Sequence, residues 1–395
     1  MREQTGAAFG EGENPGNAVY EQAPAVQQVL AHPQVVGALS RIIGPDYYME
    51  CHRHAHLTKP GQQAGGFHQD GTLRALKGWT RPWRYWHRPR KVLLIYFPQA
   101  VPEDMEVLEC RVTGGEGIMA IVNFACWHRA GANTSDRERI MLKFLFDRRS
   151  EPQAPSWDAV DRYDPGFDAK EQEWSGLDDG RLLCLPRSWQ TMWNWFGNRG
   201  EECVASVSST DELMAALGSA EEAVALEAAY GLGSQVDEAG ASALLNRLRD
   251  GEEMEREMAA LALSAAGSAA VPALRQALSD DDAWLRAMTV DLAGDLGRES
   301  LALLPEIGEA LDDEDAWVRY NAAQVLEIWG EEAEREQLRL VHALDDSETF
   351  VRFNALGALM NMRLPAGRCT ELLQKISAQD AAQAQWRLDH QRLSY

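Results

Sequence analysis

The stretch Leu278-Ser279-Asp280-Asp281-Asp282-Ala283-Trp284-Leu285-Arg286 decides the fold of the C-terminal half, because close copies of it recur at a fixed interval. The copies run from Leu311 to Arg319 and from Leu344 to Arg352, so the period is 33 residues (278, 311, 344). Leu217 and Leu248 extend the register toward the N-terminus at intervals of 31 and 30 residues. A repeat of this length with two helices per unit predicts an α-solenoid, in which each unit buries its apolar face by stacking on its neighbours.

The charged residues of the repeat have an expected structural role. The Asp-Asp pair lies where the second helix of each unit begins. We expect it to cap that helix, because carboxylates there accept bonds from free N–H groups and favour the helix dipole. Arg286 and its equivalents, one turn into the helix, are expected to bind the aspartates of the neighbouring unit. The result would be a ladder of ion pairs along the stack, so these arginines are interpreted as structural.

The repeat resembles HEAT repeats, in particular the short HEAT-like type with the pattern L-D-D-x-x-x-V-R-x-x-A-A-x-x-L. The resemblance covers residues 210 to about 365. HEAT repeats usually act as protein-binding scaffolds, so the resemblance implies a protein partner for this region.

The charge of the chain is unevenly distributed. The 395 residues carry a net charge of -23. Residues 1–150 hold 18 Lys and Arg against 15 Asp and Glu, or +3, which leaves 20 against 46, or -26, for residues 151–395. A region this acidic repels a phosphate backbone, so nucleic acid is not an expected partner. A well-solvated acidic surface is a simpler interpretation than a dedicated cationic partner.

The cysteines and the apolar runs indicate the compartment. Six cysteines are scattered without a C-x-x-C pair, which favours reduced thiols over a disulfide framework. The polar, Gly-rich start has no apolar core of a signal peptide. The longest mostly apolar run, Ile118 to Trp127, is about half the length of a membrane span. We expect a soluble cytoplasmic protein without membrane attachment.

Four segments are predicted along the chain. Residues 1–22 are expected to be disordered, and residues 23–150 to form an all-β domain that begins with a helix from Pro24 to Ile43. Short strands bounded by Gly, Pro and Asp predict an antiparallel sandwich or barrel; the expected strands are 47–57, 91–97, 107–112, 118–127 and 139–146. Residues 151–208 form a connector, and residues 209–395 the solenoid. We interpret the tryptophans of the connector as anchors between the halves; they are Trp157, Trp174, Trp189, Trp193 and Trp195.

The chemistry-bearing residues lie in the β domain. His68 and Asp70 are separated by one residue, so on an extended chain they point the same way. With His128, 58 residues later, they make two histidines and a carboxylate, the ligand set of a non-heme Fe(II) facial triad. Arg139, 11 residues further on, could hold a dicarboxylate with two parallel hydrogen bonds. A turn-rich stretch between His128 and Arg139 is expected to return the arginine to the neighbourhood of the histidine. The strand from Arg139 is predicted to be amphipathic, with one face formed by Ile140, Leu142, Phe144 and Phe146 and the other by Arg139, Met141, Lys143 and Leu145.

These residues resemble the phytanoyl-CoA dioxygenase family of Fe(II)/2-oxoglutarate oxygenases over about residues 25–148. The matching pieces are His68-Gln69-Asp70, the strand Lys91 to Gln99, and His128-x-x-Gly131-x-Asn133-x-Ser135-x-x-x-Arg139. Weaker support comes from Gly44-Pro45-Asp46-Tyr47-Tyr48.

The resemblance implies a fold, a reaction and a site. The fold would be a double-stranded β-helix, or jelly roll, with Fe(II) on His68, Asp70 and His128. The co-substrate 2-oxoglutarate would be bound by Arg139, with Asn133 and Ser135 also assigned to its site. The reaction would be hydroxylation or desaturation of a small or medium organic substrate, and the carboxylate ligand disfavours halogenation.

The chain departs from the family pattern at two places. Ala130 stands where many relatives have a serine, and the stretch Val101 to Glu109 replaces a longer loop that forms part of the usual pocket wall. The substrate therefore cannot be taken from relatives. Two alternative functions stay open: a non-catalytic interaction scaffold with a degenerate oxygenase domain, and a protein hydroxylase whose solenoid holds the substrate protein.

Two other clusters have competing interpretations. His52, His54 and His56 alternate along one strand and could form a second metal site, line the mouth of a barrel, or simply pack. The segment Arg74 to Arg90 interleaves arginines and a lysine with tryptophans and a tyrosine. It could bind an anionic or planar substrate or, as a remoter alternative, nucleic acid. It could equally dock against the acidic solenoid.

Overall fold

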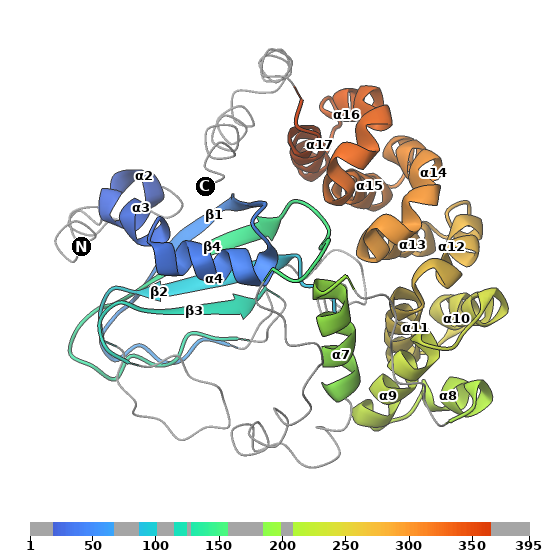
Figure 1. The fold of residues 1–395 in the computed structure, drawn as a ribbon, viewed down its shortest axis with the longest axis horizontal. Coiled ribbons are helices and arrows are strands. Elements are labelled where there is room, and N and C mark those ends of the chain that lie inside the picture. The colour runs from blue at the N-terminus through green and yellow to red at the C-terminus, as the bar shows by residue number, and fades with distance from the viewer. Residues whose placement is uncertain are drawn as a thin grey trace.

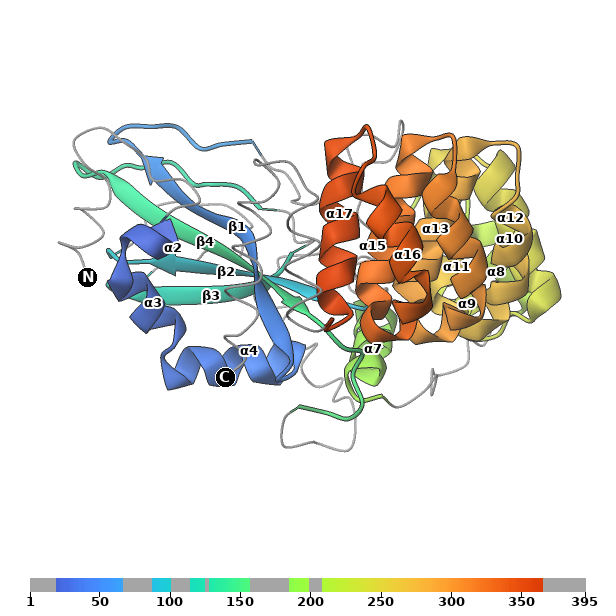
Figure 2. The same cartoon turned by 90° about the horizontal axis from the view of Figure 1, so that it is seen from above.

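The computed structural model describes residues 19–66, 87–100, 114–124, 128–156, 185–198 and 208–364. It consists of a β-sheet covered by N-terminal helices and of a curved stack of helix pairs beside it (Figure 1). Figure 2 shows the solenoid helices side by side as a block, with the sheet against one flank of that block.

The N-terminal segment forms three short helices, α2 (Val19–Gln22), α3 (Pro24–Leu30) and α4 (Pro33–Ile43). The sequence predicted one helix from Pro24 to Ile43. The chain breaks it at Pro33, which has no N–H for the previous turn, and His32 caps the new helix. The first helix also begins four residues before the expected domain start at residue 23.

Four strands make one antiparallel sheet in the order β1-β4-β2-β3. Their bounds are β1 (Tyr47–Thr58), β2 (Lys91–Phe97), β3 (Ile118–Asn123) and β4 (Arg139–Arg148). Strand β3 ends at Asn123, short of the predicted Trp127, where its pairing with Val92 near the start of β2 also ends. The expected strand 107–112 lies outside the described residues.

The sheet has two different faces. Ile140, Leu142, Phe144 and Phe146 alternate along β4 and pack with the N-terminal helices in one apolar core. Met141 and Leu145 of the same strand belong to a second, smaller cluster on the opposite face. The amphipathic alternation predicted for this strand is confirmed. What the described residues show is a small four-stranded sheet, and the full jelly roll stays a prediction.

The solenoid consists of helix pairs from α8 to α17. The bounds are α8 (Thr210–Ala216), α9 (Glu222–Gly233), α10 (Glu238–Asp250), α11 (Glu253–Ala265), α12 (Val271–Ala277), α13 (Ala283–Leu296), α14 (Leu304–Glu309), α15 (Ala316–Trp329), α16 (Gln337–Ala343) and α17 (Thr349–Asn361). The second helices α9, α11, α13, α15 and α17 are almost fully buried, and one continuous apolar core runs through the stack.

The predicted ladder of ion pairs is present. Arg286 donates to both carboxylate oxygens of Asp313 at 2.8 Å, and Arg319 reaches Asp346 at 2.7 and 3.1 Å. Arg249 makes the preceding rung with Asp280 at 2.6 Å. Each rung therefore joins one repeat to the next.

The capping role was assigned to the wrong carboxylates. The N-cap is the aspartate four positions after the leucine of the motif, Asp282 in α13 and Asp315 in α15, which accepts the N–H two residues ahead. The aspartate two positions after the leucine instead accepts the N–H of that cap residue, as Asp280 does from Asp282 at 3.0 Å and Asp313 from Asp315 at 2.8 Å. This turn fixes the carboxylate that the neighbouring arginine binds.

Candidate functional site

The face of the sheet that the N-terminal helices leave uncovered carries the described part of the predicted site. Arg139 begins β4 and lies opposite Thr58 of β1. Its guanidinium donates to the carbonyls of Gly131 (2.6 Å) and Ala132 (3.2 Å) and to the Thr58 hydroxyl (3.4 Å). Burial lowers the pKa of Arg139. In this conformation the guanidinium group joins the loop that precedes β4 to the sheet.

The two other residues assigned to the co-substrate hold the same loop together. Asn133 donates through Nδ2 to the carbonyls of Thr58 (2.9 Å) and Arg137 (2.7 Å). Ser135 donates its hydroxyl to Asn133 Oδ1 at 2.7 Å. The loop is thus a self-supporting frame, and a role of these side chains in ligand binding stays a prediction.

His128 contacts a lysine of the sheet. Its Nε2 lies 3.0 Å from Nζ of Lys143, which is only 5% exposed. Lys143 is four residues along β4 from Arg139 and on the same face, about 13 Å away along the strand. His128 therefore contacts β4 four residues away from Arg139, and the predicted closeness of the two side chains stays a prediction. His68 and Asp70 lie outside the described residues.

Two histidines of β1 lie on this face next to Lys143. His54 is the cross-strand partner of Lys143 and His56 that of Met141, and their rings meet edge to face with centroids 4.8 Å apart. Burial and then the charge of Lys143 lower the pKa of His54. Within the ranges that the structure describes, no three His, Cys, Asp or Glu side chains are grouped so that they could hold a metal ion. The side chain of His52 is not among those described.

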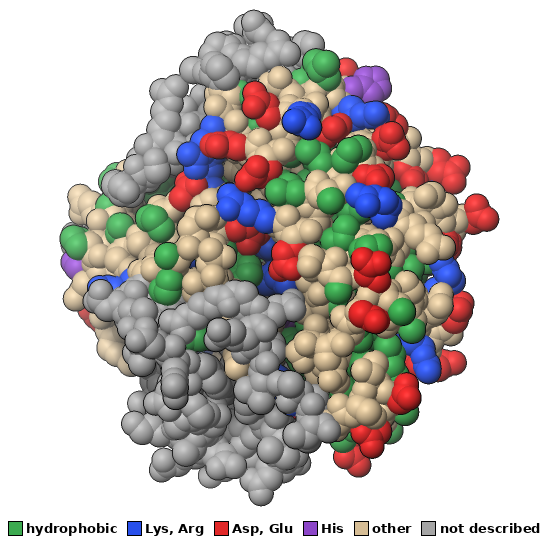
Figure 3. Space-filling model, turned by 45° about the vertical axis from the view of Figure 1, so that its right-hand side comes forward, with side chains coloured by type: hydrophobic (Ala, Val, Ile, Leu, Met, Phe, Trp, Pro, Cys, Tyr) green, Lys and Arg blue, Asp and Glu red, His purple; other side chains and the backbone are tan. Residues whose placement is uncertain are grey.

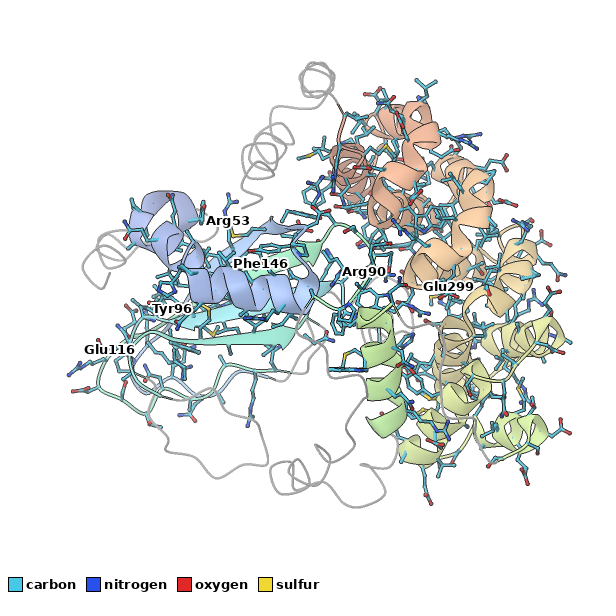
Figure 4. All side chains as sticks on the ribbon, in the orientation of Figure 1. Arg53, Arg90, Tyr96, Glu116, Phe146 and Glu299 are labelled. Atoms are coloured by element: carbon cyan, nitrogen blue, oxygen red, sulfur yellow. The ribbon has the colours of Figure 1, made fainter. Side chains whose placement is uncertain are left out.

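The second cluster of charged groups lies where the sheet meets the solenoid (Figure 4). His87 is fully buried and bonds Tyr230 of α9 (3.2 Å) and Ser264 of α11 (2.9 Å). Burial, and then Arg88 and Arg90, hold the pKa of His87 well below its usual value. A neutral imidazole therefore joins the residues before β2 to two repeats.

Arg88 and Arg90 dock on α13. Arg88 Nη1 donates to the Ser264 carbonyl at 3.1 Å and lies 3.4 Å from Asp295 Oδ2. Arg90 donates to the backbone carbonyl of Asp295 at 3.0 Å and to Glu151 at 2.6 Å. Burial raises the pKa of Asp295 to about 6, although both arginines oppose the shift. Of the alternatives for the basic segment, the structure shows docking against the acidic solenoid for these two residues.

A second buried contact joins β1 and β4 to α15. The hydroxyl of Tyr48 lies 3.0 Å from carboxylate oxygens of both Asp147 and Glu327. Lys91 Nζ pairs with Asp147 at 2.6 Å and with Glu50 at 3.2 Å. Burial is the main cause that raises the pKa of Asp147 well above its usual value. A hydroxyl has one proton to donate, so a proton on Asp147 would supply the second hydrogen bond of this cluster.

The connector adds aromatic and ionic contacts through α7 (Leu185–Phe196). Trp195 donates its indole N–H to Glu151 at 3.0 Å, and the guanidinium groups of Arg90 and Arg148 lie 5.5 and 5.4 Å from its ring centre. Arg187 forms an ion pair with Glu227 of α9. Trp195 is an anchor of the kind that the sequence predicted. Trp157 and Trp174 lie outside the described residues, as does the side chain of Trp189.

The contacts between the sheet domain and the solenoid, called the junction from here on, extend to the last repeat. Arg149 donates to Asn361 of α17 at 3.3 Å, and Arg363 pairs with Asp46 at 2.5 Å. A pocket of about 230 Å³ lies between α7 and the ends of α9, α11 and α13, lined among others by Arg88, Trp195 and Tyr230. Sequence reasoning missed the solenoid side of this junction. Its one signal was acidic residues inside the apolar second helices, of which Asp295 is the clearest.

The exposed surface of the solenoid differs from this junction. Figure 3 shows acidic side chains scattered over it, with basic ones between them. Among the described residues, no helix has both the length and the apolar character that a membrane span requires.

The comparisons with known proteins concern the repeats. A family model described as HEAT repeats matches residues 210–292 and 271–360. Residues 210–360 are therefore similar to HEAT repeats, and in the structure they form a helical solenoid. A search of curated proteins found no match to the sequence.

Two solved structures are similar in part. A chain in the complex of CpcE and CpcF of phycocyanin lyase from Nostoc sp. PCC7120 is 20% identical, with 38% of this chain and 99% of that chain covered and a TM-score of 0.33. A crystal structure of an engineered protein is 18% identical, with 48% of this chain and 98% of that chain covered and a TM-score of 0.32.

Proposed function

We propose that this protein is a non-catalytic interaction scaffold whose HEAT repeats bind the N-terminal sheet domain of the same chain and fix its position. The observation that carries the proposal is the junction: Arg88 and Arg90 enter the repeats and meet the fully buried Asp295 of α13. HEAT repeats bind proteins in general, and here one face of the stack already holds a domain. A further protein partner would then meet the outer helices α10, α12, α14 and α16, where Leu338 is 74% exposed.

The sheet face supports the non-catalytic part of the proposal. His128 Nε2 is hydrogen-bonded to Lys143. The guanidinium group of Arg139 donates hydrogen bonds to two loop carbonyls and a hydroxyl. A metal ion and a dicarboxylate would each need one of these groups. In the described part of the domain, both are used to hold the protein's own structure.

Hydrogen exchange of the intact protein tests the scaffold. Arg90→Met should speed exchange in β2 and β4 and at the C-terminal end of α13, while the rung between α15 and α17 stays protected. The reason is that Asp295 and Glu151 lose a buried cation. Arg275→Met, which removes an outer ion pair that is about half exposed, is the matched control. Equal exchange in the two variants would contradict the proposal.

A second candidate function is the Fe(II)/2-oxoglutarate oxygenase that the sequence resembles, acting on a small or medium organic substrate. The strand order supports it. In an eight-stranded jelly roll one sheet contains the first, eighth, third and sixth strands in that order, and β1-β4-β2-β3 has the same relative order. His68, Asp70 and His128 would be the metal ligands and Arg139 the co-substrate residue. Lys143 does not fit this ligand set, because its ammonium group meets the imidazole nitrogen that a metal would use.

A turnover assay separates the two candidates. Under the scaffold proposal, the purified protein with Fe(II), ascorbate and 2-oxoglutarate releases no succinate above the rates of His128→Ala and Arg139→Ala. Succinate release by the wild type that both variants lose would favour the oxygenase. The hydrogen-exchange result on Arg90→Met is independent of this outcome.

A further inference from the structure

We propose that the ammonium group of Lys143 is the resident cation of the sheet face opposite the N-terminal helices and keeps a divalent metal ion from binding at His128. The inference rests on the proposed function in one respect, because it gives a physical reason why His128 of a non-catalytic sheet domain would not bind a metal ion. It stands on different residues from the junction, so the two can fail separately.

The geometry at His128 is the first step of the argument. An ammonium group has three N–H donors and no acceptor, so at 3.0 Å the Nε2 atom must accept and its lone pair is used. A metal ion bound to an imidazole nitrogen lies about 2.1 Å from it. On the same lone pair it would lie within about 1 Å of the lysine nitrogen. The two cations therefore exclude each other.

The position of Lys143 in the sheet is the second step. It is in β4, an inner strand, with His54 of β1 opposite on one side and Ile95 of β2 opposite on the other. Only 5% of the residue is exposed. A lysine at the rim of a sheet could swing into water, but this one is enclosed by neighbouring strands. The ammonium group is thus a built-in part of the face.

Arg139 gives independent support. Its two terminal nitrogens donate to Gly131, Ala132 and Thr58, which uses three of the five N–H donors, so a dicarboxylate bound to both terminal nitrogens would compete with the loop that begins after His128. The imidazole that a metal ion would use and the guanidinium that the co-substrate would use are therefore both engaged by groups of this chain. Both contacts involve residues of β4, so this face of the sheet uses its polar side chains to stabilise the protein's own structure.

Anaerobic calorimetry and metal analysis with Fe(II) on the intact protein test the inference. The wild type should bind well below one equivalent. Lys143→Met keeps most of the apolar stem, removes the charge and should raise affinity by an amount on the order of 10- to 100-fold. Lys143→Arg keeps a cation and should stay metal-poor. The gain should disappear in Lys143→Met combined with His128→Ala, which assigns it to this site.

Two results would overturn the inference. One is a wild type that binds one equivalent of Fe(II) and loses it with His128→Ala. The other is a Lys143→Met variant that is folded by its circular dichroism and melting but binds no more Fe(II) than the wild type. Neither result bears on docking, which is measured by hydrogen exchange in Arg90→Met.

Discussion

Asp295 shows at the scale of one residue how burial and charge compete in the junction. Its side chain is fully buried between two arginines, yet its pKa is raised to about 6 from a usual 3.8. The loss of water around the carboxylate thus outweighs the attraction of the arginines. Arg88 and Arg90 reduce a penalty that would otherwise be larger.

This balance predicts a pH dependence. The folded protein holds the proton of Asp295 more tightly than the unfolded chain, so its stabilising contribution is full below about pH 3.8 and is lost as the pH rises through 6. The loss is on the order of 3 kcal/mol, because a change of one in the pKa corresponds to about 1.4 kcal/mol. Asp295→Asn resembles the protonated form, so its free energy of unfolding should match the wild type near pH 4 and equal or exceed it at pH 8.

Urea unfolding of both proteins at pH 4, 6 and 8 measures this difference. Asp281→Asn, at an exposed position of the same motif, is the control and should follow the wild type at each pH. A variant that is several kcal/mol less stable than the wild type at pH 8 would show that the ion pairs outweigh burial.

At the scale of the element, each rung of the ladder joins a helix start to the helix of the preceding repeat. Arg319 holds both oxygens of Asp346, while its third nitrogen donates to the carbonyls of Asp313 and Glu314. One side chain therefore joins the turn before its own helix to the turn before the second helix of the next repeat. The exposed fractions of the two side chains are 15% and 9%, so water competes little with the pair.

Removal of a rung should loosen the stack. Arg319→Met is expected to lower the free energy of unfolding by about 1.5 to 3 kcal/mol, the range for hydrogen bonds to charged groups. Arg275→Met removes the more exposed pair with Glu306 and should lower it by less than about 1 kcal/mol. Thermal melting of the two variants gives the comparison, and equal losses would mean that the rung has no special role.

Helix spacing depends on small residues at the crossings. A Cβ at Gly233, the last residue of α9, would lie 2.9 Å from the carbonyl carbon of Ala265 in α11. Backbone cannot yield as a flexible side chain can, so Gly233→Ala should destabilise by about 1 to 3 kcal/mol.

A helical glycine in an open position should behave in the opposite way. At Gly37, in the middle of α4, the nearest atom to a new Cβ is the end of the Arg41 side chain at 3.9 Å. Gly37→Ala should therefore stabilise by up to about 1 kcal/mol, the difference in helix propensity. Denaturant unfolding of the two variants should give shifts of opposite sign.

The sequence predicted helices, strands and ion pairs that follow from a local period. It did not predict contacts between residues that lie far apart in the chain. The ladder partner of Arg286 followed from the 33-residue period, and the two faces of β4 followed from its alternation. The role of Asp295 depends on Arg88, 207 residues earlier, and no local pattern links them. The contact between His128 and Lys143 depends on how a loop folds back.

At the scale of the whole molecule, the junction makes the sheet and the repeats one body. Contacts to the sheet side come from all five second helices, through Tyr230, Ser264, Asp295, Glu327 and Asn361. Most of the groups involved are buried and paired across the junction. If one part unfolded alone, the charged and polar groups of the other part would lose their partners. We expect the two parts to unfold together.

Calorimetry can test this coupling. The wild type should show one transition for the sheet and the repeats. Combined Arg88→Met and Arg90→Met substitutions should split it, with the sheet melting first, because the larger apolar core lies in the solenoid. Arg247→Met together with Arg275→Met, outside the junction, should leave one transition. Two transitions in the wild type would contradict the coupling.

The pairing of Arg363 with Asp46 spans 317 residues and sets a delay during synthesis. At 5 to 20 residues per second, a ribosome needs roughly 15 to 60 seconds to travel from one to the other. For much of that time His87 and Arg88, which lie just before β2, also lack partners, because Tyr230 is made 143 residues after His87 and Asp295 is made 207 residues after Arg88. Newly made chains would therefore be vulnerable to aggregation and to proteases until translation reaches the final repeat.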